Sequence, residues 1–208
     1  KIKKFIDHIL LLFDFEKKYF DKENLSNELV GHPLLDDTAE SKIDINQIFD
    51  KNKAVISIFP GSRASEINIL MPILLEFIDL MNHNYEDFIF VFHATKQYYN
   101  LVQNHLKSKN FDNCEIISDE KIKHHTLKKS VFAVAKSGTI SLEICKLKIP
   151  SIILYKMNFL NYLIVKSLVK VRFANIINIA ANKEIIPELL QSNCNSKNLF
   201  KNVSSFID

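Results

Sequence analysis

The chain has 208 residues, of which 47% are hydrophobic and 25% are charged, and its formal net charge is +3. This composition is typical of a soluble globular protein with one full core. The weak net charge is spread along the chain and argues against nucleic acid as a partner. No apolar run reaches the roughly 18 residues that a membrane-spanning helix needs.

Cysteine and histidine spacing gives no sign of a disulfide framework or a metal site. Cys114, Cys145 and Cys194 are an odd number of cysteines without a CxxC pair, so we expect reduced thiols in a cytoplasmic protein. None of the seven histidines lies in an HExxH-type motif. We therefore expect neither a metal ion nor a cofactor.

Apolar runs with strand character alternate along the chain with segments of helical periodicity. The predicted strands are Phe5–Phe13, Ala54–Phe59, Phe88–His93, Cys114–Ser118, Val131–Ala135 and Ser151–Tyr155. The predicted helices between them cover Ile67–Met81, Tyr98–Lys109, Lys121–Lys129 and Ile140–Leu147. Pro72 interrupts the first helix, where we expect a kink or a late start. Alternation of this kind predicts an α/β fold, a Rossmann-like parallel sheet with helices on both faces.

After Tyr155 the alternation ends. Three helices are predicted in succession, Phe159–Lys170, Glu184–Gln191 and Lys197–Ile207. They could close the preceding domain or pack against a part of the protein outside this chain. The chain opens on lysines that run straight into an apolar stretch, and we expect it to be a fragment of a longer protein.

Glycine is scarce, with three residues where average usage predicts about fifteen. Gly31, Gly61 and Gly138 each follow an apolar segment and precede a polar or helical one. Such glycines mark backbone that needs a positive φ or a close approach, although ordinary strand-to-helix turns also use them. Ligands bind at the carboxyl ends of strands in these sheets, so Gly61 and Gly138 are candidates for an anion site.

The segment "KSGTISLE" offers hydroxyls and free N–H groups at the start of a predicted helix. Ser137 and Thr139 flank Gly138, and the positive end of the helix dipole favours an anion there. Glu143, about one turn later, could accept hydrogen bonds from the hydroxyls of a sugar. The alternative is a simple helix cap with Glu143 in solvent.

The segment "FPGSRASEI" places an arginine after a glycine turn. The guanidinium of Arg63 can bind a diphosphate with two donors. The alternative is a surface arginine, but Arg63 and Arg172 are the only arginines in a lysine-rich chain. No residue is recognisable as a catalytic base.

These segments, in this order, resemble the lipid-A-disaccharide synthase family of bacterial glycosyltransferases. The family patterns "VGHPL.D", "LPGSR..E(I/V)" and "SGT..LE" match residues 30–36, 59–67 and 137–143, with Phe59 in place of the usual leucine. The segments "YKMNFLNYLIVKSLVKVRFANIIN" and "EIIPELLQ" follow the family pattern as well. Ile177 and Asn182 depart from it, because the family tends to have proline and glycine there.

The resemblance implies the C-terminal half of a GT-B fold. Residues 1–156 would form the Rossmann-like nucleotide-sugar-binding domain, starting in the tail of the absent N-terminal domain. Residues 157–208 would form helices that close the domain and cross back toward that N-terminal domain. The resemblance also implies a protein of the cytoplasm that is peripheral to the inner membrane.

The implied reaction transfers 2,3-diacylglucosamine from UDP-2,3-diacylglucosamine to 2,3-diacylglucosamine 1-phosphate, with inversion and release of UDP. Arg63 would stabilise the leaving diphosphate, and the general base would lie in the absent N-terminal half. The implied substrate-binding residues are Gly61, Ser62, Arg63, Ser137, Gly138, Thr139, Glu143 and Asn178.

Two alternatives remain at this stage. One is another UDP-sugar glycosyltransferase of GT-B type, such as an enzyme acting on a peptidoglycan intermediate, which would have a longer glycine-rich first loop. The other is a folded but inactive fragment of a split gene.

Overall fold

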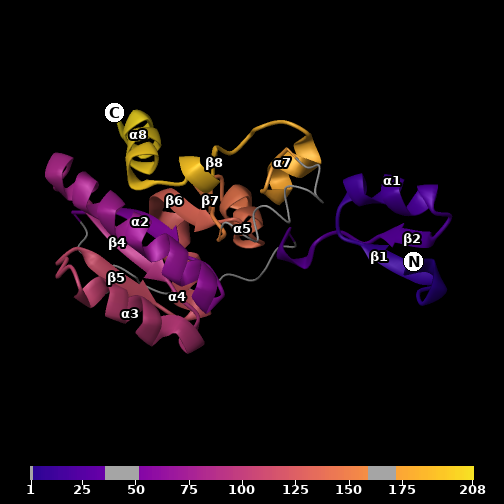
Figure 1. Ribbon diagram of the computed structural model, residues 1–208, viewed down its shortest axis with the longest axis horizontal. Coiled ribbons are helices and arrows are strands. Elements are labelled where there is room, and N and C mark those ends of the chain that lie inside the picture. Colours follow the sequence, from indigo (N-terminus) through magenta and orange to yellow (C-terminus); the bar gives the residue numbers. More distant parts are fainter. Residues whose placement is uncertain (1, 36–51, 159–171) are drawn as a thin grey trace.

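The computed structural model describes residues 2–35, 52–158 and 172–208. Its centre is a six-stranded parallel sheet with the strand order β5-β4-β3-β6-β7-β8 (Figure 1). The strands are β3 (Ala54–Phe59), β4 (Phe88–His93), β5 (Cys114–Ile117), β6 (Ser130–Lys136), β7 (Ser151–Tyr155) and β8 (Glu188–Leu190). The predicted α/β fold is confirmed.

Helices cover both faces of this sheet. They are α2 (Ala64–Asn84), α3 (Tyr99–Lys107), α4 (Glu120–Lys129), α5 (Ile140–Lys146), α7 (Ile176–Ala181) and α8 (Ser196–Ile207). Ile56 of β3 belongs to the core cluster shared with α2, α3 and α8, whereas Phe59 belongs to the cluster shared with α4 and α5. Alternate residues of each strand are therefore buried on opposite faces, which explains why the strands are almost continuously apolar.

The predicted apolar face of α2 is confirmed, but its predicted start is not. Ile67, Leu70, Leu74, Ile78 and Met81 are buried at three- and four-residue steps along this helix. The helix begins at Ala64 and contains Pro72. The late start is thus wrong, because the helix is 21 residues long and burial of its apolar face outweighs the one donor that proline lacks.

The region after Tyr155 differs from the prediction of three helices. Lys197–Ile207 is confirmed as part of α8, and Phe159–Lys170 lies outside the described residues. The predicted helix Glu184–Gln191 is wrong, since Glu188–Leu190 forms β8 and pairs in parallel with the edge of β7. Pairing with an open strand edge overrides the helical pattern of so short a segment.

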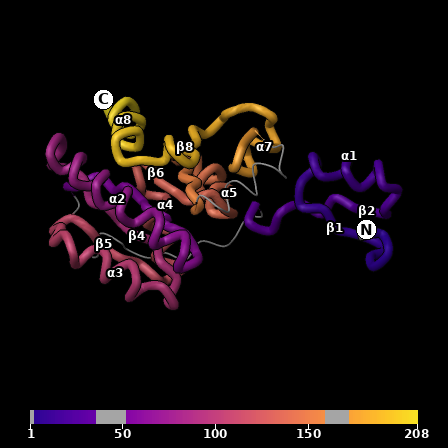
Figure 2. Tube along the Cα trace, in the orientation of Figure 1, coloured from indigo at the N-terminus to yellow at the C-terminus, as the bar shows by residue number. Residues whose placement is uncertain are grey.

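The N-terminal residues form a separate small unit. It comprises β1 (His8–Leu11), α1 (Asp14–Lys22) and β2 (Ser26–Leu29), and its two strands are parallel. Short 3-10 turns lie before and after it, at Ile2–Lys4 and Pro33–Leu35. Of the predicted strand Phe5–Phe13, only the middle is extended. Figure 2 shows this unit at one end of the molecule, away from the six-stranded sheet.

Among the described helices, none is both long enough and apolar enough to cross a membrane.

Candidate functional site

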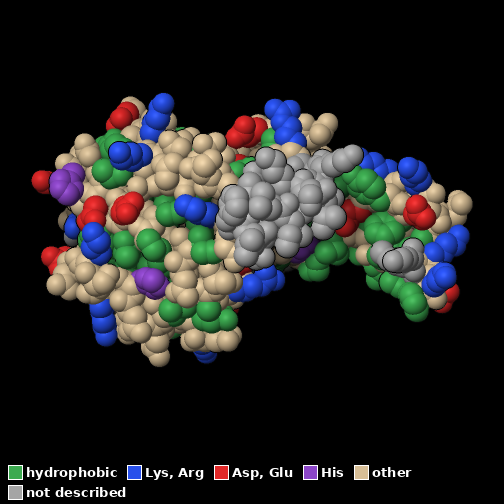
Figure 3. All heavy atoms as spheres, viewed as in Figure 1, with side chains coloured by type: hydrophobic (Ala, Val, Ile, Leu, Met, Phe, Trp, Pro, Cys, Tyr) green, Lys and Arg blue, Asp and Glu red, His purple; other side chains and the backbone are tan. Residues whose placement is uncertain are grey.

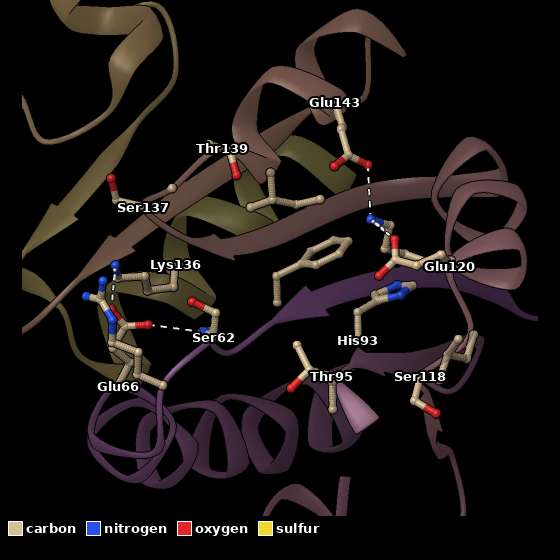
Figure 4. A pocket seen from close by; sticks show the side chains of 18 of the residues that line it. Ser62, Glu66, His93, Thr95, Ser118, Glu120, Lys136, Ser137, Thr139 and Glu143 are labelled. Carbon is tan, nitrogen blue, oxygen red and sulfur yellow. Dashed lines mark hydrogen bonds and ion pairs between the residues drawn. The ribbon is translucent and has the colours of Figure 1, made fainter. Parts of the chain in front are cut away.

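A cavity of about 440 Å³ opens at the carboxyl ends of β3, β4, β5 and β6. These four strands are neighbours in the sheet, so their last residues and the following loops meet at one edge. The side chains around it come from segments far apart in the sequence (Figure 4). The lining residues are Phe59, Gly61, Ser62, Arg63, Glu66, His93, Ala94, Thr95, Ile117, Ser118, Asp119, Glu120, Lys123, Lys136, Ser137, Gly138, Thr139, Ile140 and Glu143.

The turn at Gly61 packs closely against the carboxylate side chain of Glu66. Gly61 has a φ of +125°, and a Cβ atom at this position would lie 2.8 Å from the Cβ of Glu66. Oε2 of Glu66 accepts a hydrogen bond from the N–H of Ser62 at 3.1 Å. The turn therefore needs glycine for two reasons, its backbone conformation and the close approach of Glu66.

Glu66 also binds two cations from different elements. Its Oε1 lies 3.4 Å from a guanidinium nitrogen of Arg63 and 2.8 Å from Nζ of Lys136. Burial alone would raise the pKa of the Glu66 carboxyl. Hydrogen bonds from Lys136 and Ser62, with the charges of Lys136 and Arg63, lower that pKa instead. Glu66 is thus ionised at neutral pH and joins the turn after β3 to the end of β6.

The second turn, Ser137–Thr139, follows β6. Ser137 Oγ donates to the carbonyl of Ala174 at 2.7 Å, so this hydroxyl holds the turn against the segment before α7. Within the described residues the N–H groups of Gly138 and Thr139 have no hydrogen-bond acceptor, which leaves them available to an anion.

The expectation of a positive φ does not hold at Gly138. The glycines with positive φ are Gly31 and Gly61. A Cβ atom on Gly138 would have no neighbour nearer than the carbonyl oxygen of Lys136, at 3.9 Å. The space beside Gly138 is therefore open, and only the close approach of a ligand would require glycine here.

Glu143 points into the cavity from α5 and is paired with a lysine. Nζ of Lys123 lies 3.3 Å from Glu143 and also contacts Glu120 (Figure 4). Burial alone would lower the pKa of Lys123, but the two carboxylates raise it, so the ammonium stays charged. This part of the cavity holds two carboxylates against one cation and suits a ligand rich in hydroxyl donors.

A hydrogen-bonded chain lies beneath the cavity floor. Ser130 Oγ donates to the carbonyl of Thr126, so it accepts from Ser57 Oγ at 2.7 Å. Ser57 has then used its single hydrogen and accepts from Nε2 of His93 at 2.9 Å. His93 is therefore neutral with its hydrogen on Nε2, and its buried Nδ1 has no hydrogen-bond partner within the described parts of the chain.

Burial is the main cause that lowers the pKa of His93 to about 3, with the charge of Lys123 as a second cause. The imidazole also stacks on Phe59, with 4.3 Å between ring centroids. His93 thus forms part of the floor as a neutral ring and does not act as a cation.

The structure brings together Gly61, Ser62, Arg63, the Ser137–Thr139 turn and Glu143, but it does not bring Asn178 to this cavity. The Asn178 side chain is fully buried in α7. It accepts from the N–H groups of Ile185 and Ile186 and donates to the Ile186 carbonyl and to Glu188. The predicted contribution of this side chain to the donor pocket is corrected here to a structural role, because all its polar atoms are used within the fold.

Sequence reasoning missed several lining residues, above all His93, Lys123 and Lys136. His93 and Lys136 end strands at the cavity edge, and Lys123 lies in the first turn of α4, which begins there. His93 is the last residue of a predicted strand, so the rule that ligands bind at the carboxyl ends of strands could have indicated it.

No group of three or more His, Cys, Asp or Glu side chains that could hold a metal ion occurs in residues 2–35, 52–158 and 172–208.

Comparison with known proteins gives a family match over almost the whole chain. A family model described as lipid-A-disaccharide synthetase matches residues 1–207. The lipid-A-disaccharide synthase of Sulfurihydrogenibium sp. (strain YO3AOP1) is 33% identical over 224 residues, covering 97% of this chain and 56% of that protein. The lipid-A-disaccharide synthase of Coxiella burnetii (strain Dugway 5J108-111) is 33% identical over 196 residues, covering 92% and 50%. The chain spans about half the length of these relatives.

Solved structures share the fold at low sequence identity. The UDP-GlcNAc 2-epimerase of Methanocaldococcus jannaschii, in complex with UDP-GlcNAc and UDP, matches with a TM-score of 0.65 and 15% identity, covering 97% of this chain and 54% of that one. The ADP-heptose lps heptosyltransferase II of E. coli matches with a TM-score of 0.56 and 10% identity, covering 78% and 49%. These matches confirm the predicted fold, one half of a GT-B structure.

Proposed function

This chain belongs to the lipid-A-disaccharide synthetase family, and we propose that it forms the UDP-binding half of a glycosyltransferase of lipid A biosynthesis. The donor would be UDP-2,3-diacylglucosamine and the acceptor 2,3-diacylglucosamine 1-phosphate. The products would be the β-1,6-linked disaccharide 1-phosphate and UDP.

The observation that carries this proposal is the meeting of the two glycine turns and Glu143 around one cavity. Arg63 and the N–H groups of Gly138 and Thr139, which have no partner among the described residues, offer positive charge and donors to the same space. A nucleoside diphosphate needs such donors at its phosphates and acceptors at its ribose, and Glu143 offers acceptors at the other end of the cavity.

The chemistry would be an inverting displacement at the anomeric carbon. The acceptor 6-hydroxyl attacks that carbon, the bond to the diphosphate breaks, and the hydroxyl proton passes to a base. Arg63 and the turn N–H groups would stabilise the charge that gathers on the leaving UDP. No group in the cavity is placed here as the base, which we assign to the N-terminal half of the full-length enzyme.

The test is calorimetric titration of the chain with UDP, comparing the parent with Arg63→Ala. We expect the variant to fold normally, because the Arg63 side chain is 77% exposed. Its affinity for UDP should fall by about 1.5–3 kcal/mol, the range for hydrogen bonds to charged groups.

Arg172→Ala is the matched control, since Arg172 is exposed and does not line the cavity. Equal affinity for UDP in the parent and in Arg63→Ala would remove Arg63 from the site. Absence of UDP binding by the parent would overturn the proposal.

A further inference from the structure

Lys136 is the last residue of β6 and lines the cavity directly before the Ser137–Thr139 turn. Its side chain is 20% exposed, and its Nζ lies 2.8 Å from Oε1 of Glu66 and 5.5 Å from the ring centroid of Tyr155. The carboxylate and the ring hold the ammonium beside Glu66 and the Gly61 turn (Figure 4), and Arg63 contacts the same carboxylate.

The charges around the cavity divide into two ends of opposite sign. At one end a single carboxylate, Glu66, contacts two cations, Arg63 and Lys136, so one positive charge is left over. At the other end Lys123 contacts Glu120 and Glu143, and Asp119, next to Glu120 in the sequence, also lines the cavity, so negative charge is in excess there. An elongated ligand with an anionic part and a hydroxyl-rich part would take up one orientation in this field.

Glu66 is built in as a fixed part of the positive end. Its carboxylate is 14% exposed, accepts the N–H of Ser62 and packs on Gly61. Glu66 is therefore held within the cavity wall, whereas the Arg63 side chain is far more exposed and, among the described residues, makes one long ion-pair contact, at 3.4 Å to Glu66. Arg63 is free to turn toward a ligand, and Lys136 is already oriented.

We propose that Lys136 is a second diphosphate-binding cation and that Glu66 is the positioning residue that keeps Lys136 and Arg63 together at the rim. This rests on the proposed function, since the ligand is taken to be a nucleoside diphosphate. The rival reading is a purely structural ion pair that joins α2 to β6.

The first test compares UDP, pyrophosphate and uridine as ligands of the parent, Lys136→Met and Lys136→Arg. Methionine keeps the length of the side chain and removes the charge. We expect Lys136→Met to bind UDP and pyrophosphate about tenfold more weakly, with uridine affinity unchanged, and Lys136→Arg to recover most of the loss. Lys201→Met, on the exposed face of α8, is the matched control and should bind like the parent.

Glu66→Gln tests the positioning role. This variant should lose affinity for UDP but not for uridine, and Lys136→Met should have a smaller effect in the Glu66→Gln background than in the parent. Tighter binding of UDP by Glu66→Gln would mean that the carboxylate competes with the ligand, and would overturn the positioning role.

If a variant does not fold, protection of Lys136 from acetylation in the parent chain tests whether this lysine contacts UDP. Acetylation of Lys136, followed by mass spectrometry, should be slowed by saturating UDP but not by uridine, with Lys201 as the internal reference. Equal acetylation with and without UDP, or a Lys136→Met variant that melts earlier yet binds UDP like the parent, would leave only the structural ion pair. If the parent chain binds uridine and UDP with equal affinity, both this inference and the proposed function are overturned. If Arg63→Ala weakens UDP binding and Lys136→Met does not, this inference alone is overturned.

Discussion

Gly61 and Gly138 follow the carboxyl ends of two neighbouring strands, β3 and β6, but the two positions require glycine for different reasons. Gly61 combines a φ of +125° with close contact to Glu66. Gly138 has neither, and the space beside it is open. Substitution of the first should therefore disturb the fold, and substitution of the second should disturb only what enters the cavity.

We predict that Gly61→Ala lowers the free energy of unfolding by about 1–3 kcal/mol, the range for strained backbone. Gly138→Val should melt like the parent and lose affinity for UDP, because its branched side chain would fill the open space. Thermal melts and UDP titrations of both variants check this. A destabilised Gly138→Val with normal UDP binding would show that the second turn has no part in the site.

The neutral state of the His93 ring leads to a second prediction at the residue scale, on how stability depends on pH. Its folded pKa is about 3, below the ordinary value of 6.5. Between these two values the unfolded chain binds a proton that the folded chain does not. The stability from this group is therefore fully present above pH 6.5 and is lost as the pH falls toward 3, by at most about 1.4 kcal/mol per pH unit.

Nuclear magnetic resonance of the imidazole should show a neutral ring, protonated on Nε2, at every pH from 5 to 8 at which the chain is folded. Exposed His83 gives an internal reference that is free of this burial. A His93 signal that titrates with a midpoint near 6.5 would contradict the hydrogen-bonded chain through Ser57 and Ser130.

At the scale of elements, the contacts between α7 and β8 explain a segment that the sequence pattern assigned to a helix. Glu188 of β8 accepts from the N–H groups of Ala174 and Asn175 and from the side chain of Asn178. Ala174 in turn accepts from Ser137 in the second turn of the site. The short strand β8 thus supports the site without lining it.

We predict that Asn178→Ala lowers the free energy of unfolding by at least about 2 kcal/mol, because it leaves buried N–H groups of the Ile185–Ile186 segment without a partner. Asn182→Gly is the matched control. Asn182 ends α7 with a φ of +52°, where glycine is favoured, so this variant should be as stable as the parent or slightly more stable. Urea unfolding of both variants tests the pair, and a loss of stability only in Asn182→Gly would contradict it.

The sequence allowed prediction of the elements that carry their own pattern. β3, β4 and β7 appear at the predicted residues because runs such as Phe88–His93 are apolar on both faces. β8 and α7 could not be predicted, because each is short and is held by hydrogen bonds to residues outside itself. The three residues of β8 become a strand only where β7 offers an open edge.

The same reasoning applies to the site. Turn residues such as Gly61 and Gly138 were recognisable from their places between an apolar run and a helix. Lys136 and Lys123 were not, because a lysine in a lysine-rich chain has no distinguishing pattern. Their importance depends on which carboxylates the fold brings to them.

At the scale of the whole molecule, the N-terminal unit of β1, α1 and β2 exposes much apolar surface. Hydrophobic side chains are visible over this end of the molecule in Figure 3. Phe5 is 86% exposed, Leu10 57% and Val30 52%. A two-stranded sheet with so little cover is marginally stable alone, and a patch of this kind favours association with another protein surface.

We predict that the chain alone binds UDP but forms no disaccharide from UDP-2,3-diacylglucosamine and 2,3-diacylglucosamine 1-phosphate. On the proposed function, its residues would hold the leaving group, whereas positioning and deprotonation of the acceptor would fall to the N-terminal half of the full-length enzyme. Adding the N-terminal half of a full-length relative in trans should improve solubility, as measured by light scattering, and the same assay then tests for activity. Product formed by the purified chain alone would contradict this division of tasks.

The hydrogen-bonded chain beneath the cavity has a consequence for how the sheet assembles. Ser57, His93 and Ser130 lie on three adjacent strands, β3, β4 and β6, whose other buried side chains are apolar and do not by themselves favour one alignment over another. A slip of one residue would turn a strand's side chains to the opposite face and bury a hydroxyl or a ring nitrogen without its partner, at about 1–3 kcal/mol for each group. We expect these polar side chains to favour the observed alignment of β4, β3 and β6 during folding, and in that alignment the ends of these strands meet around the cavity.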